Sequence, residues 1–174
     1  MSRYNLNAGY GQLKAIAAHA MGGPVLGKVF VVCASGDQNY DKWRELMVPD
    51  PDGEIRFHTT LAAAYAAVIS NRNDVILLDG QSTHSLTAGI AWTKNRVNVV
   101  GMDGGDRLVQ QGAKVQLATA ATSAYVIKVT GVRNSFRNVK FIQAATAATA
   151  LHVLEEGGEG NLYKNCTFTF GVVD

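Results

Sequence analysis

Two segments in the second half of the chain have the same pattern of residues. Residues 135–142 read Ser-Phe-Arg-Asn-Val-Lys-Phe-Ile, and residues 162–169 read Leu-Tyr-Lys-Asn-Cys-Thr-Phe-Thr. Their asparagines are Asn138 and Asn165, an offset of 27 positions (165 − 138 = 27). A repeat of this length in short β-branched and aromatic segments is typical of a solenoid, in which each copy forms one coil. No other feature of the sequence constrains the architecture as strongly.

A second pair of segments supports the same architecture. Ala-Tyr-Val-Ile begins at Ala124 and Ala-Leu-His-Val begins at Ala150, an offset of 26 positions (150 − 124 = 26). After Gly80 no segment keeps a helical period, and short apolar segments recur between polar or glycine-rich loops. The predicted strands are 97–100, 115–117, 125–129, 139–142, 151–154 and 166–170. Each coil should contribute two or three strands to stacked parallel sheets.

The two repeated asparagines have a specific predicted role. Asn138 and Asn165 would occupy the same corner of successive coils, where one amide can donate to the next as in an amyloid ladder. The alternative is that both asparagines are ordinary turn formers. We favour the ladder because the flanking residues match as well, with Val139 and Cys166 pointing inward beside the two amides.

Residues 1–80 combine helices and strands. Apolar spacing from Leu13 to Ala20 predicts a short helix that ends before Gly22 and must dock on its own domain or on a partner. The segments expected to follow are a strand at 29–32, a helix around Trp43, a half-buried strand at 55–58, a helix at 61–68 capped by Thr59 or Thr60, and a buried strand at 74–80.

Composition excludes several classes of function. The chain has 174 residues and a net charge of +2, so no strongly basic face argues for nucleic acid. No apolar run approaches the length of a membrane span. The four histidines, Cys33 and Cys166 have no metal-ligand spacing, and Ser35-Gly36 is far short of a phosphate-binding loop. We therefore expect no metal and no cofactor.

Five segments resemble the right-handed parallel β-helix, or pectate-lyase-like, superfamily. Residues 60–67 followed by 73–80 are similar to that fold's capping helix and first strand, and 98–104 to its next coil. Residues 137–141 and 164–168 are similar to its asparagine corners. The resemblance covers about residues 59–170. It implies a mainly β fold, with a right-handed parallel β-helix of about four coils at 59–174 and a small α+β attachment segment at 1–58.

The N-terminal part carries a second resemblance. Residues 3–9, 23–28 and 50–60 are similar to the N-terminal part of tailed-phage virion proteins that carry such a helix. This resemblance implies a structural protein of the virion, assembled in the host cytoplasm, that serves as capsid decoration or head fibre; a tail-spike base is close behind. The implied partners are the major capsid protein or another virion protein, and further copies of this chain, preferably as a trimer. The attachment residues would be Tyr4, Leu6, Leu13 and Ile16.

The competing function is enzymatic. Enzymes of the β-helix family act on acidic polysaccharides, which implies a lyase or a hydrolase such as a tail-spike depolymerase. Hydrolysis needs a paired acid and base, and the candidates are Asp103, Asp106, Glu155 and Glu156. Both pairs occur in glycine-rich turns or loops, which favours solvated turns over catalysis. A third possibility is a non-catalytic module that binds carbohydrate on its distal surface.

Overall fold

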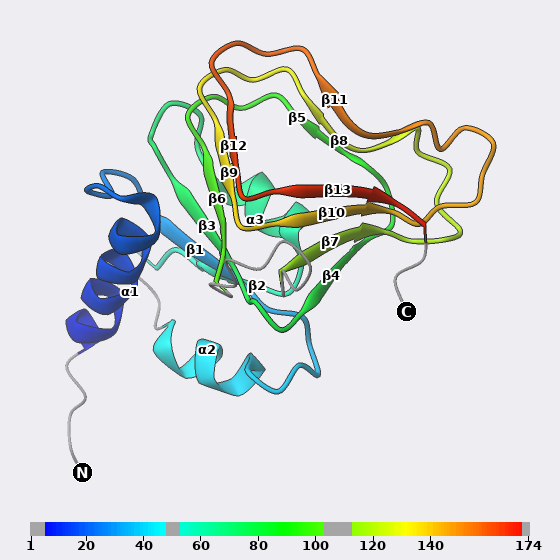
Figure 1. The fold of residues 1–174 in the computed structure, drawn as a ribbon. Coiled ribbons are helices and arrows are strands. Elements are labelled where there is room, and N and C mark those ends of the chain that lie inside the picture. The colour runs from blue at the N-terminus through cyan, green and yellow to red at the C-terminus, as the bar shows by residue number, and fades with distance from the viewer. Residues whose placement is uncertain (1–5, 48–52, 103–112, 172–174) are drawn as a thin grey trace.

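The computed structural model describes residues 6–47, 53–102 and 113–171 of the chain. The strands wind into a parallel β-solenoid of about five turns, and the described residues before β3 also form three helices (Figure 1). The predicted mainly β class and the parallel coils are therefore confirmed. The coil count is about five rather than about four, because the strand at 29–32 pairs with the solenoid and adds a layer before the first predicted coil.

The largest sheet has six parallel strands in the order β12-β9-β6-β3-β1-β2. They are β1 (Val29–Val32), β2 (Phe57–His58), β3 (Val75–Leu78), β6 (Asn98–Gly101), β9 (Ser135–Arg137) and β12 (Leu162–Lys164). Strands β1 and β2 lie within the predicted attachment segment, 1–58, and share this sheet with β3. The sheet therefore crosses the boundary that the sequence predicted between the attachment segment and the solenoid.

The other two sheets complete each coil. The four-stranded sheet, β13-β10-β7-β4, contains β4 (Thr83–Leu86), β7 (Lys114–Leu117), β10 (Lys140–Gln143) and β13 (Thr167–Phe170). The three-stranded sheet, β11-β8-β5, contains β5 (Ile90–Trp92), β8 (Tyr125–Val129) and β11 (His152–Glu156). A full coil thus contributes one strand to each sheet.

The register of the strands fixes the length of the last full coil. Lys140 pairs with Thr167 and Tyr125 pairs with His152, so both offsets are 27 positions (167 − 140 and 152 − 125). The repeat seen in the two asparagine segments is therefore the coil itself. The alignment with an offset of 26, which matched Tyr125 with Leu151, was wrong by one position; such a slip would turn the side chains of β11 to the opposite face.

Aromatic rings stack along the interior of the solenoid. Phe136 packs edge-on against Trp92, with ring centroids 5.2 Å apart, and lies parallel to Tyr163 at the same separation. Phe141 stacks on Phe168 at 5.4 Å. Trp92, Phe136 and Phe141 are fully buried. A coil lies on each side of Phe136 and Phe141, whereas Trp92, on the edge strand β5, is covered on one side by the ring of Tyr65. The side chain of Phe168, in the last described coil, is 37% exposed.

Helix α3 (Leu61–Ala67) packs next to the first strands of the solenoid. The Thr60 hydroxyl accepts a hydrogen bond from the Ala63 amide at 3.2 Å, which caps the helix as predicted. Leu61 and Ala64 point into the core beside β1, β3 and β4. The ring of Tyr65 stacks on Trp92 at 4.2 Å. The helix closes this end of the core, as the resemblance implied.

Helix α1 (Leu6–Met21) lies against the outer face of the six-stranded sheet (Figure 1). Leu13 and Ala17 are buried among sheet residues that point away from the solenoid interior, namely Val29, Val31, Val75, Leu77 and Val100. The short helix predicted from the apolar spacing is therefore present, and it docks on its own domain. Among the described residues, no helix has both the length and the apolar character needed to cross a membrane.

Candidate functional site

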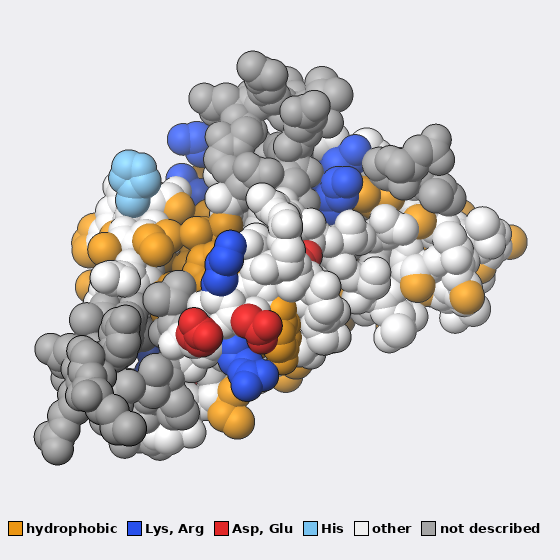
Figure 2. Space-filling model, turned by 90° about the horizontal axis from the view of Figure 1, so that it is seen from below, with side chains coloured by type: hydrophobic (Ala, Val, Ile, Leu, Met, Phe, Trp, Pro, Cys, Tyr) orange, Lys and Arg blue, Asp and Glu red, His pale blue; other side chains and the backbone are white. Residues whose placement is uncertain are grey.

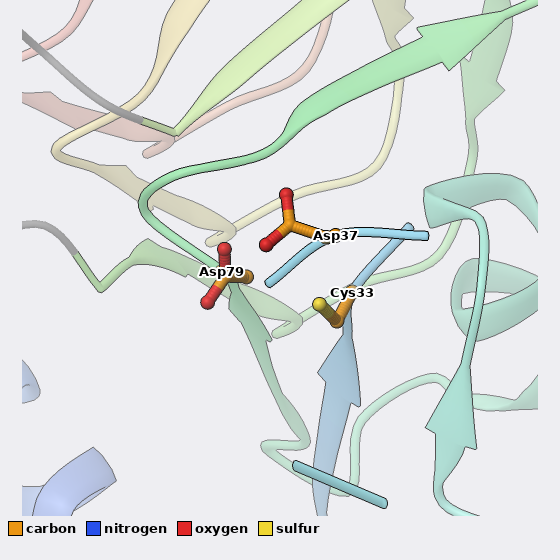
Figure 3. A group of neighbouring side chains, drawn as sticks. All are labelled: Cys33, Asp37 and Asp79. Atoms are coloured by element: carbon orange, nitrogen blue, oxygen red, sulfur yellow. The ribbon is translucent and has the colours of Figure 1, made fainter. Parts of the chain in front are cut away.

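Three side chains with metal-binding chemistry meet beyond the carboxyl ends of two strands (Figure 3). Cys33 directly follows β1, Asp79 directly follows β3, and Asp37 lies in the loop after β1. The sulfur and one carboxylate oxygen of each aspartate lie within 4.8 Å of one another. Parallel neighbouring strands end at the same edge of a sheet, which brings residues 46 positions apart together. A thiolate and two carboxylates could hold a divalent cation such as zinc.

The carboxylate of Asp79 is already occupied by protein donors. Its Oδ1 accepts from Trp43 Nε1 at 2.8 Å and from Asn39 Nδ2 at 3.1 Å. Its Oδ2 accepts from the backbone amide of Gln81 at 3.0 Å and lies 3.1 Å from the Ser82 hydroxyl. Asp79 is also buried, so these donors replace the water that its charge has lost.

The other two members of the cluster also have partners within the protein. The Ser82 hydroxyl lies 2.7 Å from Asp37 Oδ2, and its single hydrogen can bond to only one of the two carboxylates at a time. Burial raises the pKa of the Cys33 thiol to about 11, so the thiol is protonated at neutral pH. A metal would have to displace that proton and the donors around Asp79. The cluster therefore acts as a hydrogen-bonded hub that fixes the loop after β1 and helix α2 (Tyr40–Leu46) to the solenoid.

The structure brings the two repeated asparagines into contact. Asn165 Nδ2 donates to Asn138 Oδ1 at 3.3 Å, at the corner before β13 and β10. Both residues have a left-handed backbone, with φ of 51° and 55°, which asparagine tolerates better than most residues. Both proposed roles, amide ladder and turn former, thus describe these residues. Asn165 is exposed and Asn138 is half-buried, which reduces the energetic value of the amide contact.

The candidate catalytic acids do not form a facing pair among the described residues. Glu155 forms an ion pair with Lys128 at 2.5 Å, its register partner on β8. The neighbouring Glu156 accepts from the Tyr163 hydroxyl and, at 2.9 Å, from Asn161 Nδ2. Asp103 and Asp106 lie outside the described residues.

The predicted attachment residues differ in whether the structure describes them and in how exposed they are. Tyr4 lies outside the described residues, and Leu6 begins α1 with a side chain outside the described part. Leu13 is only 1% exposed, so it is unavailable to a partner because this protein's own sheet encloses it. Ile16 is 39% exposed and lines a groove of about 600 Å³ together with Met102. Figure 2 shows the molecule from below relative to Figure 1. Hydrophobic side chains gather on its α1 side, and charges of both signs lie over α2.

A column of left-handed residues runs along another corner of the solenoid. Val75, Asn98, Ser135 and Leu162 are in register from coil to coil. The residues two positions earlier are Asn73, Arg96, Arg133 and Gly160, with φ of 61°, 53°, 56° and 66°. We call these four residues the corner column. Asparagine and glycine are the usual residues for this backbone, whereas an arginine there costs about 1 kcal/mol or more.

The corner column borders a pocket of about 360 Å³. Its lining residues are Asn71, Arg96, Val132, Arg133, Glu159 and Gly160. Among the described residues, neither arginine has an ion-pair or hydrogen-bond partner for its guanidinium. This site was not predicted from the sequence. The signal that could have found it was register: Arg133 and Gly160 have the same offset (160 − 133 = 27) as Asn138 and Asn165.

Comparison of the chain with known protein families, with curated proteins and with solved structures gives no match.

Proposed function

We propose that this chain is a structural protein of a tailed-phage particle, serving as capsid decoration or head fibre. The observation that carries the proposal is the last described coil. Strands β11, β12 and β13 are the outer strands of their sheets. Leu162, Phe168 and Phe170 on this coil are 45%, 37% and 64% exposed. Unpaired strand edges with exposed aromatic side chains favour association with another protein surface.

The proposed attachment side is the opposite part of the molecule. The resemblance of residues 3–9, 23–28 and 50–60 to tailed-phage virion proteins supports an N-terminal attachment. Ile16 and the groove beside it supply an exposed apolar surface on α1 for the major capsid protein or another virion protein. Leu13 contributes indirectly, because it holds α1 on the sheet.

Self-association is the second part of the proposal. The apolar coil end of one copy would be covered by further copies, and the phage resemblance favours a trimer. A cyclic assembly would remove the exposed Phe168 and Phe170 from water. The location of the protein would then be the virion.

The alternative function is a polysaccharide lyase or hydrolase of the same fold, and a non-catalytic carbohydrate-binding module is the third. The partners of Glu155 and Glu156 favour the structural role. Each carboxylate is held by a neighbouring side chain of the same or the preceding coil. An inverting or retaining pair would instead face a shared substrate across a gap of about 5–10 Å.

Mass spectrometry of purified phage particles tests the proposal. A structural protein should be present in stoichiometric copies, and incubation with pectin, alginate and capsule polysaccharides should release no new reducing ends and no unsaturated products. Polysaccharide cleavage that is lost in Asp103→Asn or Asp106→Asn would make the protein an enzyme. Absence of the chain from the particles would contradict the structural role.

Sedimentation of matched variants tests the coil end. Phe168→Ser with Phe170→Ser should reduce self-association, because it removes apolar surface from the last coil. Ile69→Ser is the control, since Ile69 is 53% exposed but lies after α3, away from that coil. Equal self-association of the two variants would argue against the coil end as the interface.

A further inference from the structure

We propose that the corner column binds an oxyanion between Arg96 and Arg133. The ligand chemistry is a carboxylate, phosphate or sulfate group on a small molecule or sugar. The site is separate from the coil end and from the α1 groove of the proposed function, and it does not depend on either.

The first support is that two arginines line one pocket and that neither guanidinium has a protein partner among the described residues. Arg96 and Arg133 both line the pocket of about 360 Å³ and both are exposed. Glu159 also lines the pocket, yet neither arginine forms an ion pair with it or with another described carboxylate. The charged lining residues therefore sum to +2 − 1 = +1. A concave surface with excess positive charge attracts anions.

The second support is the choice of residue at a demanding backbone position. Asn73 and Gly160 show which residues suit the left-handed conformation in the same column. Two successive coils instead use arginine, although no described contact of either guanidinium stabilises the fold. An unfavourable backbone residue without a structural contact points to a role for its side chain in binding.

The third support is that the corner is rigid. The Arg96 amide donates to the Val132 carbonyl at 3.0 Å, and the Arg133 amide donates to the Glu159 carbonyl at 2.9 Å. The side chains of the residues after Arg133 and Gly160 add further bonds between coils. Asn134 Oδ1 accepts from the Val97 amide at 2.9 Å, and Asn161 Oδ1 accepts from the Asn134 amide at 2.7 Å.

This arrangement sets the geometry of the two arginines. Neighbouring parallel strands are about 5 Å apart, so the two arginine backbones are held at about that separation. Each guanidinium presents a planar fork of donors that matches a carboxylate, phosphate or sulfate. The two forks can approach one oxyanion from adjacent coils without any movement of the backbone. Binding therefore orders only the two side chains, which lowers its entropic cost.

The experiment is an NMR titration of the intact chain at low ionic strength, where surface charges are least screened. The probes are glucuronate, glucose 6-phosphate, inorganic phosphate and, as the neutral control, glucose. We expect the anions to shift the amide signals of residues 132–134 and 159–161 with dissociation constants on the order of 1 mM, and glucose to shift none. Preference among the three anions identifies the source of the oxyanion, either a uronate, a sugar phosphate or free phosphate.

The decisive variants are Arg96→Asn and Arg133→Asn. Asparagine is the residue that the neighbouring coil uses at Asn73, so the fold should keep or raise its melting temperature. Each variant should weaken anion binding roughly threefold to tenfold, because one charge-assisted fork is lost. Glu159→Gln should tighten binding, because it removes the only carboxylate among the lining residues.

Two results would overturn the proposal. One is the absence of any anion-dependent shift at the corner in the unmodified chain. The other is unchanged affinity in both arginine variants; a lowered melting temperature in the same variants would show that the arginines serve the fold. The melting temperature separates a structural from a binding role, since only a structural role predicts its loss.

Discussion

The indole nitrogen of Trp43 donates to Oδ1 of Asp79 at 2.8 Å, and so joins helix α2 to the end of β3. The two residues are 36 positions apart, and Asp79 is 2% exposed. Asn39, the residue immediately before the same helix, donates from its Nδ2 to the same oxygen. This buried carboxylate therefore ties α2 to the solenoid, in addition to the apolar packing of Trp43 against the sheet and the ring contact of Tyr40 with Phe57.

Asp79→Ala should destabilise the protein by about 2–5 kcal/mol, because it leaves several donors without their acceptor in a buried place. Urea unfolding followed by circular dichroism measures the loss. Asp41→Ala is the matched control, since Asp41 is exposed on α2 and should change the free energy of unfolding by less than about 0.5 kcal/mol. Equal effects of the two variants would mean that the hub does not hold α2.

The asparagine corner allows its two roles to be separated. Asn165→Gly keeps a residue suited to φ of 51° and removes the side chain that donates to Asn138, for an expected loss of about 0.5–1.5 kcal/mol. Asn165→Ala also forces a Cβ-bearing residue without a polar side chain into the left-handed region, adding about 1 kcal/mol. Thermal unfolding of the two variants and of the same pair at Asn138 gives both contributions. A glycine variant as stable as the original chain would mean that the amide ladder contributes nothing.

Stability should fall as the pH is lowered below about 6.5, partly because of His84. Burial lowers the pKa of this imidazole from its ordinary value of 6.5. Its Nε2 lies 3.1 Å from the carbonyl oxygen of Asp79, and because that oxygen can only accept, Nε2 carries the hydrogen. Its buried Nδ1 faces no acceptor, so a second proton on the ring would have no hydrogen-bond partner. The unfolded chain therefore takes up a proton at a higher pH than the folded chain does.

This difference in proton uptake sets the direction in which stability changes with pH. Above pH 6.5, His84 is neutral in both the folded and the unfolded chain, and it does not lower the free energy of unfolding. Between pH 6.5 and the lower pKa of the folded state, only the unfolded chain takes up the proton, so the free energy of unfolding falls. Denaturant midpoints from pH 8 to pH 5 should decline in the original chain and decline less in His84→Leu. Some decline should persist in His84→Leu, because burial also lowers the pKa of His58. His19→Gln, a change on an exposed part of α1, is the control, and a slope as steep in His84→Leu as in that control would exclude His84 as the cause.

The Cys33 thiol should react slowly in the folded protein. It is fully buried, and burial raises its pKa to about 11, so little thiolate forms at pH 8. In a Cys166→Ala variant, a disulfide reagent such as Ellman's should label Cys33 only as fast as the protein opens, and denaturant should accelerate the labelling greatly. Rapid labelling of the native Cys166→Ala variant would show that the hub opens readily.

The sequence predicted the strands with continuous apolar residues and missed β4, β5, β9 and β12, which are short or carry polar residues between their inward side chains. Strand β4 was missed because His84 takes a buried position that usually carries an aliphatic residue. Strands β9 and β12 lay in the recognised repeat, but the repeat was interpreted through its asparagines rather than through Phe136 and Tyr163, whose rings stack on each other.

The candidate site residues were predictable only where they repeat along the chain. The contact of Asn138 with Asn165 follows from the period of the repeat, whereas the meeting of Cys33 with Asp79 depends on β1 pairing with β3. That pairing joins the two parts that the sequence analysis divided at residue 58. Arg96 was hidden for another reason: its offset to Arg133 is 37 positions (133 − 96 = 37), because the intervening coil is longer than the repeat.

The solenoid has a consequence for how far this protein can reach. The residues of one coil, fully extended, would span about 90 Å. In the solenoid the same residues add only about 4.8 Å along the axis, which is the spacing between neighbouring strands. The five described turns therefore extend roughly 20–25 Å along the solenoid axis. Most of the chain length therefore goes into the circumference of the coils rather than into extent along the axis. These turns therefore form a low, broad knob rather than a long protrusion.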